Sequence, residues 1–583
     1  MNAPFLPPPE ADVAQDENGI PPGKRLIRAG NGAGLSLGER LSAHLYRLSW
    51  RTPLHALRLK GRHPLKLLAA PADPLMGDAD RGRTILAGRF SFEGASVAMG
   101  EDGPELGTAP ERLVAHYHSF NWLRDVAAVG GDEAASAIRR FVAGWLAAHG
   151  NTVAEPAWAA GIAGRRLLNW PSFAPMLLGQ NDLVFRSSVL NALARTARHL
   201  DRVADRTPPG LERIAAWCGI VAAGLLIAGG DGRRAFGEAG LIKALDGSLG
   251  EDGGLNSRSP AEQFELVALL SHLLSMYDAR RLPVPLALAN ALSKAVPPLL
   301  GCTLGDGGMG SWQGGSPMSA QSVRDVVDAS RVRCRPLRQA RGWGYQRLAA
   351  GHTILIMDAG PPPHSRTTRH GCASTFAFEM SDGMDRLIVN CGGASAAGLI
   401  DTPGLAAGLR TTAAHSTLIL ADTNSTAVLT NGSVGKGVDT VELDRRESEQ
   451  GSRVEGSHDG YAKRFGFTHT RSIAVTGDGK EVRGEDTLIP VEGRKKIVEA
   501  AFAARFHLAP GVDPSPTADG QGALLRIDGG ALWQFRARGG AVSIEPSLWV
   551  NGEGRWQASH QIVVEGTAVA GGATIGWVIK RAG

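Results

Sequence analysis

The chain has 583 residues, of which 43% are hydrophobic and 20% charged, and its formal net charge is +5. This length exceeds what a single hydrophobic core usually supports, so we expect at least two domains. The composition excludes a disordered or collagen-like chain, and the absence of a dense Lys/Arg block argues against nucleic-acid binding. The modest positive charge would suit an anionic small molecule or polyanion.

The first 35 residues are rich in proline and lack the apolar segment of a secretory signal, so residues 1–35 are predicted to be a disordered tail. The longest apolar run, 218–230, is too short for a bilayer, which takes roughly 20 residues. Five scattered cysteines without a CxxC pair indicate free thiols. We therefore expect no transmembrane segment and a cytoplasmic location, with periplasmic association left open.

Residues 46–68 form a basic and amphipathic stretch, a pattern that can indicate a helix lying on a membrane surface. Pro53 and Pro64 interrupt it, which favours a packed N-terminal arm.

Apolar residues recur at three- and four-residue spacing from about residue 36 to about residue 300, each run closed by Gly or Pro. The clearest predicted helices cover 111–130, 132–150, 180–204, 208–230, 231–250, 259–281 and 283–300. Successive helices without strands predict an all-α domain, placed at 36–320, as a bundle, solenoid or closed α/α toroid.

Polar and apolar residues alternate after about residue 340, with Gly, Asp and Asn at the turns. A dozen or so strands in a row predict an antiparallel β-sandwich, placed at 321–583. The Gly-rich string "GDGGMGSWQGG", 305–315, lacks the Lys and Ser/Thr of a P-loop and is interpreted as a linker or a cleft-lining loop.

Four strings carry a resemblance to a known family: "GRRLLNW", "HGCASTFAFEMSDGMDRLIVNCGG", "RTTAAHSTLIL" and "GSHDGYAKRFGFTHTRSI". With the order of helices and strands, they make the chain from about residue 40 onward resemble the heparinase II/III family of polysaccharide lyases. The resemblance implies an N-terminal α/α toroid followed by a C-terminal antiparallel β-sandwich. It also implies β-elimination on uronic-acid-containing polysaccharides such as glycosaminoglycans, in the cleft between the two domains and without a required cofactor.

Elimination needs a group that neutralises the uronate carboxylate, a base for the C5 proton and an acid for the leaving oxygen. In the family, an Asn (or a His with Glu) on a helix neutralises, while a helical-domain Tyr and a sandwich His act as base and acid. Here the helical position reads Leu211 and Glu212, and the loop 251–265 contains no Tyr. Glu212 could be a binding carboxylate, but its place at a predicted helix N-terminus is more typical of a partner of the helix dipole.

The resemblance also implies a structural zinc or other divalent metal in the sandwich. Cys372 stands where the family has a metal-binding His, Asn390 lies near the family's Asp, and His415 matches its last His. Ser374 replaces a further Asp of that loop. The alternative is that Cys372 is a small buried apolar residue and His415 is hydrogen-bonded in the core.

The candidate acid/base residues on the sandwich side are His370, His415, His458 and Tyr461. A Tyr can exchange a proton when a neighbouring His shares it or a cation lowers its pKa, and Tyr461 sits beside His458 in one motif. The alternative is that Tyr461 packs over the sandwich edge while His458 bonds a turn carbonyl.

Arginine binds carboxylates bidentately, so the basic residues of the same loops are candidate substrate ligands. They are Arg366, Arg369 and Arg410, joined by Arg258 and Asn256 if the helical loop lies as in the family. Each one taken alone is more typical of a solvated surface group, but together in a cleft they would neutralise a uronate.

The leading hypothesis is a lyase acting on an acidic polysaccharide, with a homodimer left open. The rival is a non-catalytic relative, a polysaccharide-binding or assembly protein that kept the cleft and lost the helical Asn and Tyr. A third hypothesis is an inverting glycoside hydrolase using two carboxylates among Asp252, Glu262 and Glu265, about 6.5–9.5 Å apart.

Overall fold

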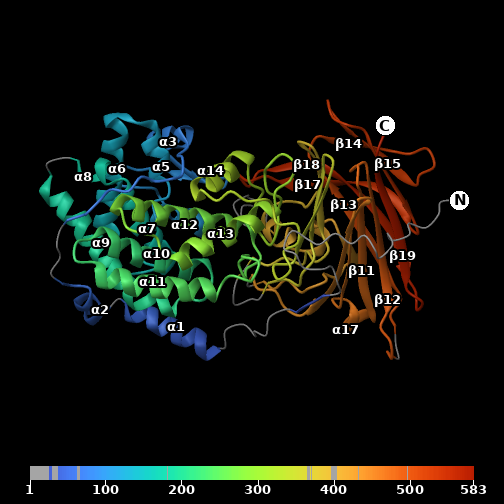
Figure 1. Cartoon of the computed structure of the whole chain (residues 1–583), viewed down its shortest axis with the longest axis horizontal. Coiled ribbons are helices and arrows are strands. Elements are labelled where there is room, and N and C mark those ends of the chain that lie inside the picture. The colour runs from blue at the N-terminus through green and yellow to red at the C-terminus, as the bar shows by residue number, and fades with distance from the viewer. Residues whose placement is uncertain are drawn as a thin grey trace.

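The computed structural model describes residues 25–28, 37–50, 52–61, 66–179, 182–363, 368, 370–394, 404–430, 432–494 and 497–582. Helices gather at one end of the elongated molecule and strands at the other (Figure 1). An α/α toroid followed by an antiparallel β-sandwich confirms the predicted fold class.

The helical half runs from α1 to α14 and includes one hairpin, formed by β2 (Arg89–Phe92) and β3 (Ala95–Ala98). Its helices are α1 (Leu37–Ser49), α2 (Pro53–Arg58), α3 (Ala79–Leu86), α4 (Glu111–Ser119), α5 (Leu123–Val129), α6 (Gly131–His149), α7 (Ala160–Ser172), α8 (Ala174–Leu178), α9 (Leu183–Val203), α10 (Leu211–Leu226), α11 (Asp231–Asp246), α12 (Pro260–Arg280), α13 (Leu286–Gly301) and α14 (Ala320–Ser330).

Helix α10 lies at the centre of the toroid, and nearly all of its residues are buried. It packs closely on α7, because a Cβ on Gly219 would lie 2.7 Å from the Cα of Gly164. At the sandwich end of α12, Ser259 is the N-cap and Pro260 occupies the first turn, as helix starts favour. The N-terminal ends of α7, α10 and α12 are joined by Arg165 of α7, which donates to Glu212 of α10 and Glu265 of α12.

The strand half consists of two antiparallel sheets whose members alternate along the chain. The nine-stranded sheet has the order β1 (Arg25–Arg28), β9 (Thr440–Ser448), β10 (Gly451–His458), β11 (Phe467–Thr476), β12 (Glu481–Pro490), β19 (Ala573–Arg581), β16 (Trp533–Arg538), β15 (Gly522–Ile527) and β14 (Val512–Pro516). The eight-stranded sheet has the order β17 (Ala541–Val550), β18 (Trp556–Ala568), β13 (Ala500–Leu508), β7 (Asp385–Val389), β6 (Phe378–Asp382), β5 (Thr353–Asp358) and β4 (Tyr345–Ala350), with β8 (Leu418–Leu420) also paired to β13.

The sandwich core lies between these sheets, where alternating residues of each strand point inward. Phe378 of β6 stacks on Trp577 of β19 with ring centroids 5.4 Å apart, and Phe506 of β13 meets the same Trp edge-on. Aromatic packing therefore joins the two sheets.

Two predicted boundaries change. Residues 25–28 form β1, paired to β9 from Arg25 opposite Leu443 to Arg28 opposite Thr440, so the prediction of a disordered tail is wrong for this part of 1–35. The boundary predicted at 320/321 falls at the start of α14, which packs on α12 and α13. None of the described helices is long and apolar enough to cross a membrane.

Candidate functional site

The toroid meets the sandwich around Asp358, the fully buried last residue of β5. Its carboxylate accepts hydrogen bonds from Gln313 Nε2 at 2.8 Å and Ser374 Oγ at 2.8 Å, and it pairs with the guanidinium of Arg258. A buried carboxylate with three donors is fully satisfied, and its role is to join the two domains.

The Gly-rich loop 305–315 fills this junction. Trp312 and Gln313 are both buried, and Gln313 Oε1 accepts the backbone N–H of Cys372 at 2.9 Å. The loop therefore packs between the two domains. Its predicted role was that of a linker or a cleft-lining loop.

Arg258, predicted to bind substrate, is used inside the protein. Its Nε donates to the carbonyl of Trp343 at 2.7 Å and its Nη1 to that of Pro361 at 2.6 Å, while Nη2 faces Asp358. The hydroxyl of Tyr345 donates to the Arg258 carbonyl at 2.7 Å. All three guanidinium nitrogens thus bond inside the protein and the side chain is buried, so Arg258 is not placed to form a bidentate pair with a uronate.

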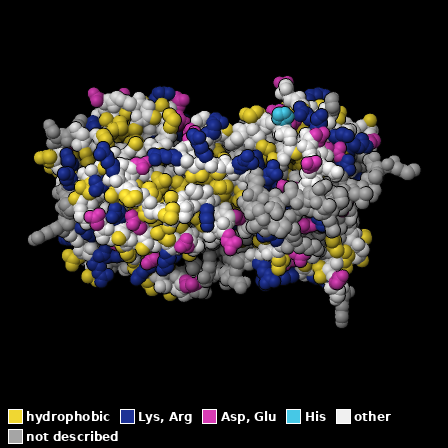
Figure 2. Space-filling view, in the orientation of Figure 1, with side chains coloured by type: hydrophobic (Ala, Val, Ile, Leu, Met, Phe, Trp, Pro, Cys, Tyr) yellow, Lys and Arg dark blue, Asp and Glu magenta, His cyan; other side chains and the backbone are white. Residues whose placement is uncertain are grey.

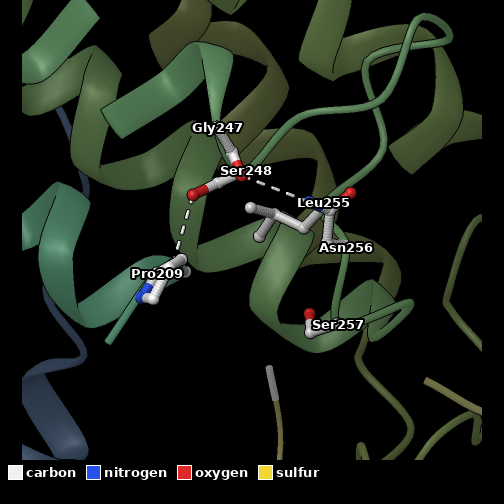
Figure 3. A pocket seen from close by; sticks show the side chains of 7 residues that line it. Pro209, Gly247, Ser248, Leu255, Asn256 and Ser257 are labelled. Atoms are coloured by element: carbon white, nitrogen blue, oxygen red, sulfur yellow. Dashed lines mark hydrogen bonds between the residues drawn. The ribbon is translucent and has the colours of Figure 1, made fainter. Parts of the chain in front are cut away.

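Asn256 is exposed and lies beside a small pocket that the side chains of Ser248, Leu255 and Ser257 also line (Figure 3). The hydroxyl of Ser248 accepts the backbone N–H of Gly210 at 3.2 Å, which closes one side. The pocket holds about 10 Å³, room for about one water and none for a sugar ring.

Arg410 fastens the loop that carries His370 and Cys372. Its Nε donates to the carbonyl of Gly371 at 2.9 Å and its Nη2 to that of Gly432 at 2.7 Å, and the side chain is buried. His370, the only sandwich candidate with an exposed side chain among those described, extends from this loop.

The predicted ligands Arg366 and Arg369 lie outside the described residues.

The residues predicted to hold a metal do not fit one. The amide of Asn390 accepts the backbone N–H of Ser416 at 3.0 Å through Oδ1 and donates to Glu379 Oε1 at 3.1 Å through Nδ2. His415 Nδ1 donates to a backbone carbonyl at 2.7 Å, and Cys372 is buried. In the part of the chain that the structure describes, no three His, Cys, Asp or Glu side chains are grouped to bind a metal. This arrangement supports the alternative of structural residues.

Tyr461 is completely buried at the start of a short helix, α17 (Ala462–Phe465). Its hydroxyl donates to the carbonyl of Leu418 in the facing sheet at 3.0 Å. Burial raises the pKa of this phenol above its usual value, so it stays protonated. The position argues against the predicted acid/base role, because the hydroxyl is inaccessible from the surface and already donates to a backbone carbonyl.

His458 is the first member of a buried hydrogen-bonded chain. Its Nδ1 accepts the N–H of Gly460 at 3.1 Å, so its Nε2 donates to His469 Nδ1 at 3.1 Å. His469 Nε2 then donates to Asp486 at 2.8 Å, and Arg471 donates two hydrogen bonds to the same carboxylate, at 2.6 and 2.9 Å. Burial lowers the pKa of both imidazoles, which stay neutral in this chain. We call these four residues (His458, His469, Asp486 and Arg471) the sandwich cluster.

A second polar group lies at the N-terminal ends of α7, α10 and α12. Arg165 of α7 donates to Glu212 of α10 at 2.9 Å and to Glu265 of α12 at 3.1 Å. Burial raises the pKa of Glu262, one turn before Glu265, to about 7, and the charges of Glu265 and Glu212 add to the effect. We call Arg165, Glu212, Glu262 and Glu265 the toroid cluster.

Each of the three glutamates of the toroid cluster was named from the sequence. That they lie close together, and that Arg165 pairs with two of them, was not predicted. The available signal was the string "GRRLLNW", which contains Arg165. Asp252, the other carboxylate of the hydrolase hypothesis, does not join them, because it accepts the N–H groups of Gly342 and Trp343 at 3.0 and 2.8 Å.

The family model "Heparinase II/III-like, C-terminal" matches residues 333–578, from the segment before β4 to β19. Over 571 residues, the chain is 30% identical to FtsZ-localized protein C of Caulobacter vibrioides (strain NA1000 / CB15N), covering 93% of this chain and 95% of that one. The chain belongs to the heparinase II/III family.

Solved structures show the same two-domain architecture. A crystal structure of heparinase III matches with a TM-score of 0.70 at 14% identity, covering 95% of this chain and 93% of that one. The heparan sulfate lyase HepC of Pedobacter heparinus matches with a TM-score of 0.57 at 14% identity, over 93% of this chain and 90% of that one. A chondroitin AC lyase of Streptomyces coelicolor A3 matches with a TM-score of 0.51 at 10% identity, over 94% and 83%. The protein thus has a polysaccharide lyase-like fold.

Proposed function

We propose that this protein is a non-catalytic member of the heparinase II/III family that localises to FtsZ. The observation that carries the loss of catalysis is the position of Tyr461 and His458. A general acid or base must come within hydrogen-bonding distance of the proton it transfers, and both side chains bond to other protein groups inside the sandwich. The relation to FtsZ rests on the relative whose name records that location, with which the chain shares 30% identity over nearly its full length.

The charges at the toroid end support the same proposal. Arg165 is the cation paired with Glu212, which stands at the family's helical position, and it is also paired with Glu265. A uronate placed there would meet three carboxylates, which would raise the energy of the developing enolate that elimination requires.

Two measurements on the full-length protein test the proposal. Incubation with heparan sulfate, heparin and chondroitin sulfate, with a heparinase III as positive control, should give no ultraviolet absorbance from an unsaturated uronate. Sedimentation with FtsZ polymerised by GTP should carry the protein into the pellet, and without GTP it should stay in the supernatant. Steady product formation on any of these polymers would restore the lyase hypothesis, and absence from the FtsZ pellet would remove the proposed location.

A glycoside hydrolase is the second candidate, favoured by one observation. Glu262, with a pKa near 7, has the protonation of a general acid, and Glu212 and Glu265 are carboxylates that lie close to it. Release of reducing ends from a neutral polysaccharide, abolished by Glu262→Gln, would establish this function. No release from any polymer tested would exclude Glu262 as a catalytic acid.

A further inference from the structure

The segment that connects α14 of the helical half to β4 of the strand half (Figure 1) is rich in arginine. Residues 331–341 read "RVRCRPLRQAR", with five arginines and no acidic residue. On the face of the molecule drawn in Figure 2, by contrast, Lys and Arg side chains are interspersed with Asp and Glu. A run of one sign without intervening opposite charge concentrates a positive potential at one place on the surface.

Two arginines of this segment have no counter-ion. Arg333 and Arg335 are exposed, and within the part of the chain that the structure describes neither guanidinium forms a hydrogen bond or an ion pair. Arg331 pairs with Asp278 at 2.8 Å, but the two side chains are 69% and 48% exposed, so water screens this pair. The guanidinium groups of Arg333 and Arg335 are therefore free to bind an anion from outside the chain.

The backbone between these arginines is also unpaired. Residues 332–337 lie outside any helix, strand or turn, and the amide groups of 333–335 form no hydrogen bond with another described residue. Pro336 favours an extended conformation at Arg335, because the proline ring clashes with a helical residue before it. An extended segment with free N–H and C=O groups can pair with a further strand, as the edge of a sheet does.

Both ends of the segment are fixed to the body of the protein. Val332 packs on the hydrophobic core of the toroid, and its N–H donates to Ser330 Oγ at 3.1 Å. At the other end, the N–H of Leu337 donates to the carbonyl of Pro297 in α13 at 3.0 Å. Because the segment is already held in place, a partner would lose little binding free energy in ordering it.

The spacing and the chemistry of this surface fit an extended peptide that carries carboxylates. Side chains two residues apart in an extended chain lie on the same side, about 6.6 Å from each other. This spacing relates Arg333 to Arg335, and it also relates acidic residues at alternate positions of a peptide. A planar guanidinium binds a carboxylate through two parallel hydrogen bonds, and pairing of the two backbones would fix their register.

A single-stranded nucleic acid also has regularly spaced anionic groups, but its binding sites provide aromatic side chains on which the bases stack. The aromatic residues that follow the segment, Trp343 and Tyr345, are both buried. Its own apolar side chains, Val332 and Leu337, are partly buried against the protein. The surface thus offers cations and backbone groups without an aromatic platform, which favours an acidic peptide.

We propose that residues 331–335 bind an extended acidic peptide of a partner protein. Arg333 and Arg335 each pair with one carboxylate, and the amide groups of 333–335 pair with the backbone of the peptide. The inference goes beyond the proposed function, because it uses no residue of the sandwich cluster or the toroid cluster and does not depend on the loss of catalysis.

The test is fluorescence anisotropy of the full-length protein with two labelled peptides of equal length, each with four Glu among Thr residues. In one peptide Glu occupies every second position, and in the other every third, which places successive carboxylates on different sides of an extended chain. The first peptide should bind more tightly, by about threefold or more, and its affinity should fall as salt is added. The variant Arg333→Gln/Arg335→Gln should bind it about tenfold more weakly, because two exposed charge pairs are lost.

The matched control is Arg526→Gln/Arg538→Gln, which removes two exposed arginines of the sandwich and should bind the peptide like the wild type. Circular dichroism should be the same for all three proteins, since every substituted side chain is exposed. Equal affinity of the wild type and Arg333→Gln/Arg335→Gln would overturn the proposal, as would equal affinity for the two peptides or no binding of either. If a labelled oligothymidine binds more tightly than the peptides and only Arg333→Gln/Arg335→Gln loses it, the segment binds nucleic acid and the peptide proposal is wrong.

Discussion

The sandwich cluster and the toroid cluster use similar residue types in opposite ways. The first is fully buried, and each of its side chains forms a hydrogen bond or an ion pair with another member. In the second, Arg165 pairs with Glu212 and Glu265, whose side chains are 55% and 41% exposed, and the charges of these two glutamates help to raise the pKa of Glu262. The residues that resemble a catalytic motif thus hold the fold, while Glu212, Glu262 and Glu265 come from segments where the resemblance would place the family's neutralising Asn and its Tyr.

The sharpest test of this contrast is Asp486→Ala in the sandwich cluster. It leaves Arg471 buried without its partner and removes an acceptor from His469 and Trp577, so the free energy of unfolding should fall by about 3–5 kcal/mol. Urea denaturation followed by circular dichroism measures this. The control is Glu553→Ala, whose pair with Arg555 is exposed and whose loss should cost less than about 0.5 kcal/mol. A loss below about 1 kcal/mol for Asp486→Ala would show that the cluster is not structural.

Arg165→Met likewise removes one charged side chain from the toroid cluster. The methionine keeps the packing of the aliphatic stem, but Glu212 and Glu265 lose their shared counter-ion. Because both glutamates are well exposed, the cost should be only about 1–2 kcal/mol, and it should grow at low salt where the carboxylates repel more strongly. Urea denaturation at low and high salt measures it. A loss as large as that of Asp486→Ala would mean that the two clusters do not differ in kind.

Tyr461→Phe separates structure from chemistry within the sandwich motif. The substitution keeps the ring and removes the hydrogen bond to Leu418, so we expect a loss of about 1 kcal/mol in unfolding free energy. Binding to polymerised FtsZ should not change. A drop in any catalytic activity larger than the change in folded fraction would return Tyr461 to the candidate acid/base residues.

The sequence allowed the fold to be predicted because periodicity is a local property. It could also have indicated the burial of the sandwich cluster, since alternation places His458 on the same face of β10 as Val454. His458 and Tyr461 were nevertheless predicted to be acid/base residues, because a Tyr close to a His in one motif is typical of proton transfer. That pattern carries no information on the direction of the side chains.

The toroid cluster was out of reach for a different reason. Arg165 lies 47 residues from Glu212 and 100 from Glu265, so only the closing of the toroid brings them together. The segment that forms α1 and α2 was predictable in part. Pro53 correctly marked the break between the two helices, but the face that docks on the toroid is set by His199 and Arg202 of α9.

The smallest effect expected is a pH dependence that belongs to the toroid cluster alone. The pKa of Glu262 rises from 4.5 to about 7 on folding, so between these values the folded protein holds a proton that the unfolded chain has released. The free energy of unfolding should therefore fall as the pH rises from about 4.5 to about 7, by about 1 kcal/mol for a partly exposed group. Glu262→Gln cannot ionise and should lose this part of the slope, whereas Glu553→Gln should keep it. Urea denaturation across this pH range gives the three slopes, in which the titration of the histidines is common to all. Parallel curves for wild type and Glu262→Gln would show that the pKa of Glu262 is not raised by folding. The toroid cluster would then have no carboxyl group able to act as an acid near neutral pH.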